Sequence, residues 1–385
     1  MRILFVHAGA ELYGADRILL ELVGGLIDRG HGAIVVLPGP GPLVEPLQRA
    51  GARVHLRSLG VLRRKYFTIG GLLGRCRRML AATFWLTRLI RTEKVDLVHT
   101  NTSVVFPGAF AALLARRPHV WHIHEITTRP VMVRRMLSFL VPRLSACVVC
   151  VSRSVEENLL AGSARFRHKF SVIYNGISPL EFRPDARGRV RAEFGVADDS
   201  VLVGMVGRVN RWKGQGALVE SARLLFERGA TARYLMVGGT VAGEESRMHD
   251  LQRKVSESGL ESIITVCRFR TDVADLLSAM DVFVLPSTEP DPFPTVVLEA
   301  MGAGLPVVAF PHGGVREMIE DGVSGVLATA MEPKALAASI NSYLTDPARR
   351  LAAGRAARQR VATAFSRNRF LDGFEALYRR LTRQV

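Results

Sequence analysis

The sequence predicts an α/β protein with two domains, each built on a doubly wound parallel sheet. Three observations carry this prediction. The chain has 385 residues, which is about the size of two domains rather than one. Short apolar segments alternate with amphipathic ones, a pattern typical of strand–helix–strand units. This alternation pauses at residues 178–195, a stretch rich in proline, glycine and charge, and then begins again.

Each predicted strand is a short apolar run, followed by a helical pattern such as residues 17–28. The first series comprises residues 3–6, 33–37, 54–56, 97–99, 120–123 and 146–151. The second comprises residues 201–206, 234–237, 263–266, 282–285 and 307–309. We expect an N-terminal domain of residues 1–177, a linker of residues 178–197 and a C-terminal domain of residues 198–360. Ligands of such sheets lie beyond the carboxyl ends of the strands, so the site is expected in the cleft between the domains.

Composition and charge narrow the class of protein. The chain has four cysteines, and Cys147 and Cys150 lie in an apolar run typical of a buried strand, so neither a zinc site nor a disulfide framework is expected. This cysteine usage fits a reducing cytoplasm, and neither a signal peptide nor a membrane-spanning segment is predicted. The formal net charge of +17 favours a polyanionic partner, an anionic surface or a phosphorylated substrate.

The first candidate site follows the strand predicted at residues 201–206. Gly207 and Gly214 let the backbone approach a ligand, and the helix that follows offers free N–H groups. Arg208 and Lys213 add two cations to the same turn. This combination favours a diphosphate site, although turns between a strand and a helix often carry a glycine and a solvated lysine.

The second candidate is a pair of carboxylates, Asp291 and Glu299, on either side of a proline-containing loop. We interpret Glu299 as the opening of a helix. Such a pair can accept hydrogen bonds from two sets of sugar hydroxyls, one on each side of a diphosphate. The alternative is a simple loop acid at Asp291 and a carboxylate at Glu299 that stabilises the positive end of its helix.

In order and spacing, these segments resemble the pattern of glycosyltransferase family 4 over residues 10–317. The motifs that carry the resemblance are Gly-Ala-Asp at 14–16, His-Ile-His-Glu at 122–125, Val-Ile-Tyr-Asn-Gly-Ile at 172–177, Gly-Arg at 207–208, Lys-Gly at 213–214, Val-Gly-Gly at 237–239, Thr-Asp-Val at 271–273, the two carboxylates, and Gly-Gly-Val-Arg-Glu at 313–317.

The resemblance implies the GT-B fold, with two Rossmann-like domains facing across a cleft. It also implies retaining transfer of a sugar from a nucleoside-diphosphate sugar, without an obligatory metal or another cofactor. The last helix of this fold crosses back onto the N-terminal domain, and we expect residues 361–385 to do so. The saccharide or lipid-linked acceptor, the pathway and the oligomeric state stay open.

Site residues follow from the resemblance by position. Arg208 and Lys213 would hold the diphosphate and neutralise the leaving group. Glu299 would bind the ribose, Asp291 would contact hydroxyls of the transferred sugar, and Gly14 would let the first loop lie against the diphosphate. The implied donor-binding residues are Gly14, Gly207, Arg208, Lys213, Arg268, Phe269, Asp291, Phe293, Pro294, Thr295 and Glu299. The predicted catalytic residues are His124, Arg208, Lys213 and Asp291.

His124 occupies the position of a family histidine that lies close to the transferred sugar. The alternative is a structural histidine at the end of a strand. A metal site built with the nearby histidines is disfavoured, because no cysteine or second carboxylate joins them. No metal ligands are therefore assigned.

Three departures from the family pattern leave the donor open. Asp291 replaces a usual glutamate, Pro294 a common glycine and Arg268 a frequent glycine. The shorter acid and the missing backbone donor put the transferred sugar in doubt, and Arg268 puts the base in doubt.

A basic, apolar stretch in the N-terminal half predicts reversible attachment to an anionic membrane, on the inner face of the cytoplasmic membrane. Residues 61–91 carry Arg63, Arg64, Lys65, Arg75, Arg77, Arg78, Arg88 and Arg91. A helical projection places Leu72, Cys76, Met79, Leu80, Leu86 and Ile90 on one side, with Trp85 near Arg78. A second such stretch covers residues 129–143. The alternative is an ordinary surface helix packed on a core.

Two other functions stay open at this point. A nucleotide-sugar epimerase of the same fold would turn over the donor without an acceptor. A nucleic-acid-binding protein is disfavoured, because glycine–proline loops stand where the aromatic platforms for single strands would be expected.

Overall fold

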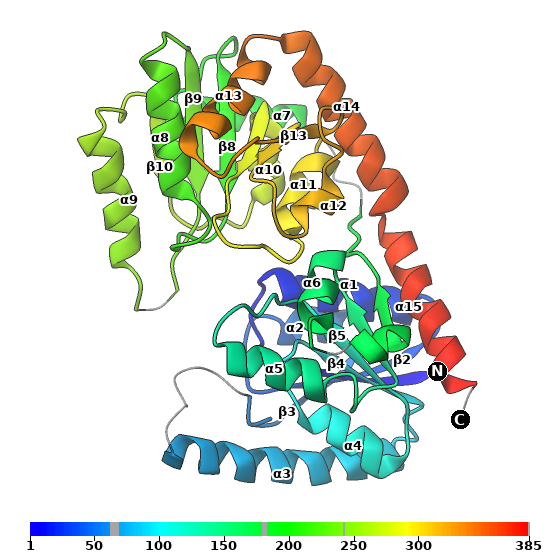
Figure 1. Cartoon of the computed structure of the whole chain (residues 1–385). Coiled ribbons are helices and arrows are strands. Elements are labelled where there is room, and N and C mark those ends of the chain that lie inside the picture. Colours follow the sequence, from blue (N-terminus) through cyan, green and yellow to red (C-terminus); the bar gives the residue numbers. More distant parts are fainter. Residues whose placement is uncertain (62–68, 163, 179–182, 242, 384–385) are drawn as a thin grey trace. The chain divides into compact units, whose positions relative to one another are not determined.

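A computed structural model of the chain describes residues 1–61, 69–162, 164–178, 183–241 and 243–383, with the backbone alone at 69–72. It divides the chain into two compact α/β units (Figure 1). Unit 1 comprises Met1–Gly176 and Arg367–Val385, and unit 2 comprises Ile177–Ser366. Arg63, Arg64 and Lys65 of the predicted basic segment lie outside the described residues.

Unit 1 contains a seven-stranded parallel sheet with the order β3-β2-β1-β4-β5-β6-β7. Its strands are β1 Arg2–His7, β2 Gly32–Leu37, β3 Arg53–Leu56, β4 Leu97–Asn101, β5 His119–Ile123, β6 Cys147–Cys150 and β7 Phe170–Val172. The direction of winding reverses between β1 and β4, which are neighbours in the sheet. His7 and Asn101, the last residues of these two strands, are partners in the register. Ligand sites of doubly wound sheets lie at this kind of switch point.

Helices cover both faces of the unit 1 sheet. They are α1 Gly14–Asp28, α2 Val44–Arg49, α3 Ile69–Thr92, α4 Pro107–Ala115, α5 Val131–Leu140, α6 Arg153–Leu160, the 3-10 turn Ala164–Lys169 and α15 Arg367–Thr382. Along β1, Ile3 and Phe5 pack with α1 and α15 on one face, whereas Leu4 and Val6 pack with α3 and α4 on the other. This division follows from the alternation of side chains along a strand.

Unit 2 repeats the plan with a six-stranded parallel sheet of order β10-β9-β8-β11-β12-β13. Its strands are β8 Val201–Val206, β9 Ala232–Val237, β10 Ile264–Cys267, β11 Val282–Leu285, β12 Val307–Ala309 and β13 Gly325–Leu327. Its helices are α7 Pro184–Glu193, α8 Gln215–Phe226, α9 Ser246–Glu257, α10 Val273–Ala279, α11 Thr295–Gly302, α12 Val315–Met318, α13 Pro333–Leu344 and α14 Pro347–Ala364. The switch point here lies between β8 and β11.

The structure differs from the sequence-based expectation in three places. Strands β7 and β13 had not been anticipated, because their sequences, Phe-Ser-Val and Gly-Val-Leu, are short and interrupted by a serine or a glycine, unlike the equally short apolar run of β12. The segment expected as a linker, residues 178–197, contains α7, which packs against α10 within unit 2. The boundary expected at residue 361 falls inside α14, and the chain passes to unit 1 after Ser366.

Helix α15 is part of unit 1 through an apolar face and a set of ion pairs. Phe370, Phe374 and Tyr378 are buried in the same core cluster as α1 and β1. At the edge of this contact, Arg367 pairs with Glu21 and Asp28 of α1. The chain's last described helix therefore completes the fold of the first domain.

Candidate active site

The turn after β8 is held by its own hydrogen bonds. Asn210 accepts the backbone N–H groups of Trp212 and Lys213 on Oδ1, at 3.1 and 2.8 Å. Gly214 then begins α8 with φ +84°, and a Cβ at this position would lie 1.8 Å from the carbonyl oxygen of Pro286. Only glycine fits this left-handed and crowded position. The turn is thus fixed against the loop that follows β11.

Lys213 and Asp291, which the sequence places in two separate motifs, meet in the structure. Lys213 Nζ lies 2.5 Å from Asp291 Oδ2, and the two side chains are only 13% and 10% exposed. The ammonium also lies 4.6 Å from the centre of the Trp212 ring. A carboxylate and an aromatic face therefore hold a largely desolvated cation at the carboxyl ends of β8 and β11, the switch point of unit 2.

The loop of Asp291 is packed against a glycine pair. Gly314 donates its N–H to the Asp291 carbonyl at 2.8 Å, and a Cβ on Gly313, which has φ +67°, would lie 2.4 Å from the same oxygen. Phe293 is buried, with its ring 5.6 Å from that of Phe365. The Gly-Gly motif at 313–314 therefore acts on the site by fixing the backbone of Asp291.

The position of Glu299 corrects one interpretation of the sequence. Helix α11 begins at Thr295, with Pro294 as its N-terminal cap, so Glu299 lies in the second turn and does not open the helix. The positive end of the helix lies at Thr295 instead, because the free N–H groups belong to the first turn. A role in stabilising the helix end therefore fits the position of Glu299 less well than a role in accepting hydrogen bonds from sugar hydroxyls.

Arg268 and Phe269 directly follow β10. Both side chains are exposed, Phe269 by 63%. A Cβ on Gly239 would lie 3.1 Å from Phe269 Cβ, so the loop after β9 passes close to this one. The predicted donor-binding residues of unit 2 thus lie on loops that follow its strands and on the first two turns of α11.

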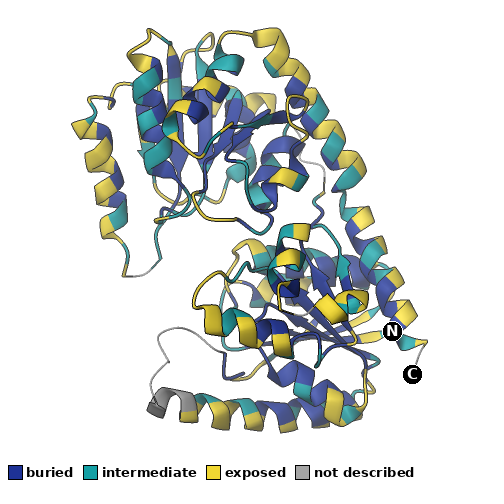
Figure 2. Cartoon of the chain, in the orientation of Figure 1, coloured by how far each residue is buried: buried dark blue, intermediate teal, exposed yellow. Residues whose placement is uncertain are grey.

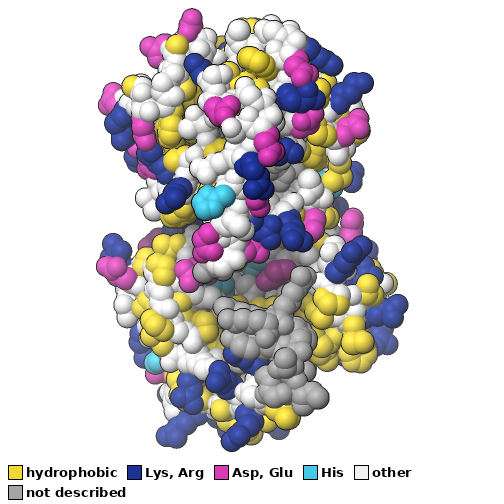
Figure 3. Space-filling model, turned by 90° about the vertical axis from the view of Figure 1, so that its left-hand side faces the viewer, with side chains coloured by type: hydrophobic (Ala, Val, Ile, Leu, Met, Phe, Trp, Pro, Cys, Tyr) yellow, Lys and Arg dark blue, Asp and Glu magenta, His cyan; other side chains and the backbone are white. Residues whose placement is uncertain are grey.

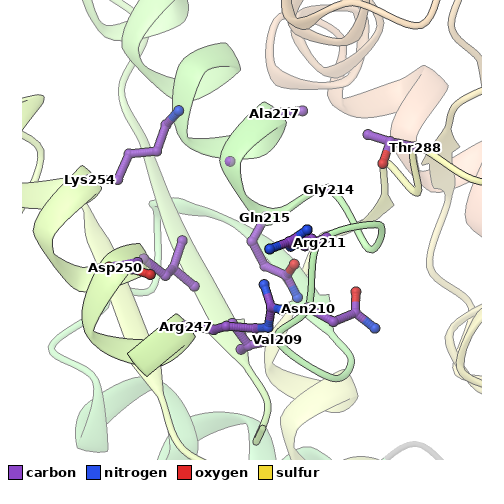
Figure 4. A pocket seen from close by; sticks show the side chains of 12 residues that line it. Val209, Asn210, Arg211, Gly214, Gln215, Ala217, Arg247, Asp250, Lys254 and Thr288 are labelled. Atoms are coloured by element: carbon purple, nitrogen blue, oxygen red, sulfur yellow. The ribbon is translucent and has the colours of Figure 1, made fainter. Parts of the chain in front are cut away.

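A cavity of about 290 Å³ lies at the start of α8. Figure 4 shows Gln215, Arg211 and Arg247 close together there, with Lys254 and Asp250 on α9. Gln215 donates from Nε2 to the Arg208 carbonyl at 2.9 Å, which ties the cavity wall to the predicted diphosphate turn. The sequence had offered no signal for this wall, because Gln215 and Arg247 belong to no motif.

Unit 1 contributes the other two predicted residues, Gly14 and His124. Gly14 is the exposed first residue of α1. His124 follows β5 and is half-buried, and its Nε2 lies 2.8 Å from Asn101 Oδ1. The Glu125 carboxylate accepts the backbone N–H groups of His124 and Ser103. His124 is thus fixed by its side chain and by its backbone.

Burial keeps several histidines of unit 1 neutral. Desolvation and, to a lesser extent, the electrostatic influence of His7 lower the pKa of His124 to about 3. Desolvation also lowers the pKa of His119 to about 3 and holds the pKa values of His99 and His122 well below the usual range. Neutral imidazoles can both donate and accept a hydrogen bond.

The described histidines are not arranged as metal ligands. Within the described ranges, no group of three or more His, Cys, Asp or Glu side chains is placed to hold a metal ion. His119 instead bonds to Thr100 Oγ1 and faces the Leu144 carbonyl. His99 pairs with the Tyr378 hydroxyl at 2.6 Å.

Comparison with known proteins gives the family. Residues 13–179 match the model described as Glycosyltransferase Family 4, and residues 187–360 match Glycosyl transferases group 1. The D-inositol 3-phosphate glycosyltransferase of Nocardiopsis dassonvillei is 31% identical over 223 residues, or 56% of this chain and 51% of that protein. The amylovoran biosynthesis glycosyltransferase AmsK of Erwinia amylovora is 27% identical over 267 residues, or 66% and 62%. The chain thus spans between half and two thirds of the length of these relatives.

A solved structure is similar over the whole chain. Anabaena HepE, in complex with UDP-glucose, is 26% identical and aligns with a TM-score of 0.84, covering 99% of this chain and 100% of that one. This likeness and the two parallel-sheet units confirm the predicted GT-B fold. With both halves matched by models of one class of enzyme, the chain belongs to glycosyltransferase family 4.

Proposed function

We propose that this glycosyltransferase moves a sugar from a nucleoside-diphosphate sugar to a saccharide acceptor, with retention of the anomeric configuration. The observation that carries the proposal is the desolvated Lys213–Asp291 pair beside a glycine turn. The pair offers a cation for a leaving diphosphate and a carboxylate for sugar hydroxyls at one point. The likeness to HepE, which binds UDP-glucose in its structure, supports a UDP-sugar as the donor. Retention rests on the family pattern alone.

Each site residue has a distinct task in this proposal. Lys213 and Arg208 stabilise the charge that develops on the leaving diphosphate, so no metal ion or other cofactor is required. Asp291 orients the Lys213 ammonium and accepts hydrogen bonds from the transferred sugar. Glu299 accepts hydrogen bonds from the ribose. The loops of Arg268, Phe269, Phe293, Pro294 and Thr295 form the walls around base and sugar.

Variants of the two carboxylates are expected to have different effects on UDP binding. Glu299→Ala should weaken binding of UDP itself, because it removes an acceptor for the ribose. Asp291→Asn should leave UDP binding unchanged or tighter, since it removes a negative charge beside Lys213, but should weaken discrimination among UDP-sugars. Thermal stabilisation by UDP and by a panel of nucleotide sugars measures both effects.

Equal loss of UDP stabilisation in both variants would contradict this division of tasks. An exposed acid of the same unit, replaced in Glu332→Gln, serves as the control and should bind UDP like the wild type. Donor consumption without any acceptor, measured in the same preparation, would favour a nucleotide-sugar epimerase.

We also propose that unit 1 attaches reversibly to anionic membranes, where it meets a lipid-linked acceptor. None of the described helices is long and apolar enough to cross a bilayer. Helix α3, however, exposes Leu73, Leu80 and Phe84, by 63, 57 and 67%, and Figure 2 shows its outward face as exposed. Arg77, Arg88 and Arg91 extend the same stripe at helical spacing. In Figure 3, apolar and basic side chains lie interspersed in the lower part of the picture, which shows unit 1.

The structure corrects part of the expected helical projection. Leu86 and Ile90 are buried against the sheet, as in the alternative of a surface helix packed on a core. Leu80 is exposed, and nothing is described of the Leu72 side chain. Trp85 packs against that same core, 5.7 Å from the ring of His55 and with Arg57 over its face. The membrane proposal therefore rests on Leu73, Leu80 and Phe84 rather than on Trp85. On α5, Met132 and Phe139 are exposed in the same way.

The protein is expected to float with vesicles that contain phosphatidylglycerol at low salt and to be released as salt is raised. Leu80→Ser/Phe84→Ser should abolish flotation without unfolding, since both side chains are exposed. The matched control is Leu351→Ser on α14, which removes an equally exposed leucine from unit 2. Equal binding to neutral vesicles, or no binding at low salt, would contradict the proposal.

A further inference from the structure

A chain of hydrogen bonds joins a buried carboxylate to His124 within unit 1. Asp16 Oδ1 lies 2.7 Å from His7 Nε2, His7 Nδ1 lies 3.0 Å from Asn101 Nδ2, and Asn101 Oδ1 lies 2.8 Å from His124 Nε2. Asp16, His7 and Asn101 are 6, 2 and 0% exposed. The four residues come from α1, β1, β4 and the end of β5, so the switch point of the sheet assembles the chain.

The donor and acceptor atoms of each group fix the direction in which these hydrogen bonds are donated. A carboxylate only accepts, so His7 carries its hydrogen on Nε2. His7 Nδ1 then accepts from the Asn101 amide, whose Nδ2 also faces the Ala15 carbonyl at 3.5 Å. The remaining Asn101 oxygen can only accept, so His124 donates from Nε2. Every donor therefore points toward Asp16, and His124 is left with a lone pair on Nδ1.

We propose that Asp16, His7 and Asn101 are positioning residues that hold His124 as the neutral tautomer with its hydrogen on Nε2. The Nδ1 lone pair is then the acceptor for a substrate hydroxyl, and this last step rests on the proposed function. The partner of one ring nitrogen sets the state of the other. The ring of His122 lies 4.0 Å from that of His124. It does not compete for the hydrogen bonds of His124, because neither of its nitrogens has a partner among the described residues.

Asp16→Asn tests the direction of the chain. Tyr13 donates its backbone N–H to Asp16 Oδ2 at 3.0 Å, so the oxygen of the new amide is required there and its NH2 group must face His7. His7 then accepts on Nε2 and donates from Nδ1, Asn101 turns over, and His124 accepts on Nε2. The variant should therefore move the hydrogen of His124 to Nδ1, while the start of α1 keeps its cap.

Asn101→Asp should have the opposite outcome. A carboxylate at this position accepts from both histidines, so His124 keeps its hydrogen on Nε2. In the double variant Asp16→Asn/Asn101→Asp, His7 accepts from the new amide and donates to the new carboxylate. The double variant is therefore expected to restore the wild-type tautomer that the single Asp16→Asn loses. A merely structural role for Asp16 gives no such rescue.

The readout is the imidazole ¹⁵N spectrum of the full-length protein with labelled histidine, in which His124 is assigned by its loss in His124→Gln. We expect Nε2 protonated and Nδ1 unprotonated in the wild type and in the double variant, and the reverse in Asp16→Asn. With donor KM nearly unchanged, kcat of Asp16→Asn should fall about 10- to 100-fold, as for outer partners that orient a functional histidine, and the double variant should recover most of it. His119→Gln changes a buried histidine that is not part of this hydrogen-bond chain, and it should alter neither the tautomer of His124 nor kcat.

A wild-type His124 protonated on Nδ1 overturns the proposal, as does an unchanged tautomer in Asp16→Asn. The wild-type spectrum decides alone if the variants do not fold. Full activity of His124→Gln would rule out the hydrogen bond from a substrate hydroxyl to His124 Nδ1, yet the spectra would still test the chain of hydrogen bonds.

Discussion

Lys213→Ala is expected to lower turnover by about 10- to 1000-fold, the range that follows the loss of one preorganised electrostatic stabiliser. The physical reason is twofold. The variant removes a desolvated cation from the leaving diphosphate, and it leaves Asp291, which is 10% exposed, as an unpaired carboxylate beside the same charge. Initial rates of sugar transfer with a UDP-sugar identified in the thermal panel measure the effect.

Three further measurements accompany this one. Lys334→Ala removes an exposed lysine from α13 of the same unit and should leave turnover unchanged. Lys213→Ala/Asp291→Asn should bind UDP better than Lys213→Ala alone, because the unpaired carboxylate is gone. EDTA should not change the wild-type rate, since Arg208 and Lys213 supply the positive charge. A rate abolished by EDTA and untouched by Lys213→Ala would contradict the metal-independent assignment.

For the candidate donor site, the sequence indicates residues but not the contacts between them. Arg208, Lys213, Asp291 and Glu299 stand out by type and spacing, because glycine turns and paired carboxylates are local patterns. That Lys213 bonds directly to Asp291 depends on how β8 and β11 pair, and the sequence carries no signal for a contact between residues 78 positions apart. The same holds for His7 and Asn101, which are 94 positions apart and meet only because β1 and β4 are neighbours.

The fold was predictable where strands are uninterrupted apolar runs in the middle of a sheet. Val201–Val206 and Val282–Leu285 are apolar runs that match the central strands of unit 2, since parallel strands covered on both faces lack polar positions. The segment at residues 178–197 misled for a related reason. Helix α7 has little apolar periodicity and buries Arg191 together with Ala186 and Val190. A buried arginine cannot be told from a solvated one by a charge-rich composition.

Arg191 is the residue of α7 on which unit 2 depends most, and Arg191→Met is expected to destabilise unit 2 by about 1–3 kcal/mol, because buried acceptors lose their donor. Asp281 keeps a second ion pair, with Arg187 at 2.8 Å, so its charge is not left uncompensated. Arg191 is 1% exposed and lies 3.1 Å from Asp281 Oδ2, and it also donates to the carbonyls of Ala279, Ala197 and Ser200. Asp281 in turn accepts the Leu202 N–H at 2.7 Å, so the pair joins the beginnings of β8 and β11. Without the guanidinium, the carbonyls of Ala197 and Ser200 lose a donor in a place that water reaches poorly. Asp281 and the Ala279 carbonyl keep their contacts with Arg187.

Hydrogen exchange measured by mass spectrometry tests this prediction on the intact chain, because it reports each unit separately. In Arg191→Met, peptides of β8 and β11 should exchange faster by the factor that corresponds to the lost free energy, while peptides of β1 and β4 in unit 1 stay at the wild-type rate. Arg189→Met is the matched control on the same helix, since Arg189 is 62% exposed and its pairing with Asp275 is worth less than about 1 kcal/mol. Equal exchange in the two variants would show that α7 stabilises unit 2 without the Arg191–Asp281 pair, as a covering helix whose charges are interchangeable with apolar side chains.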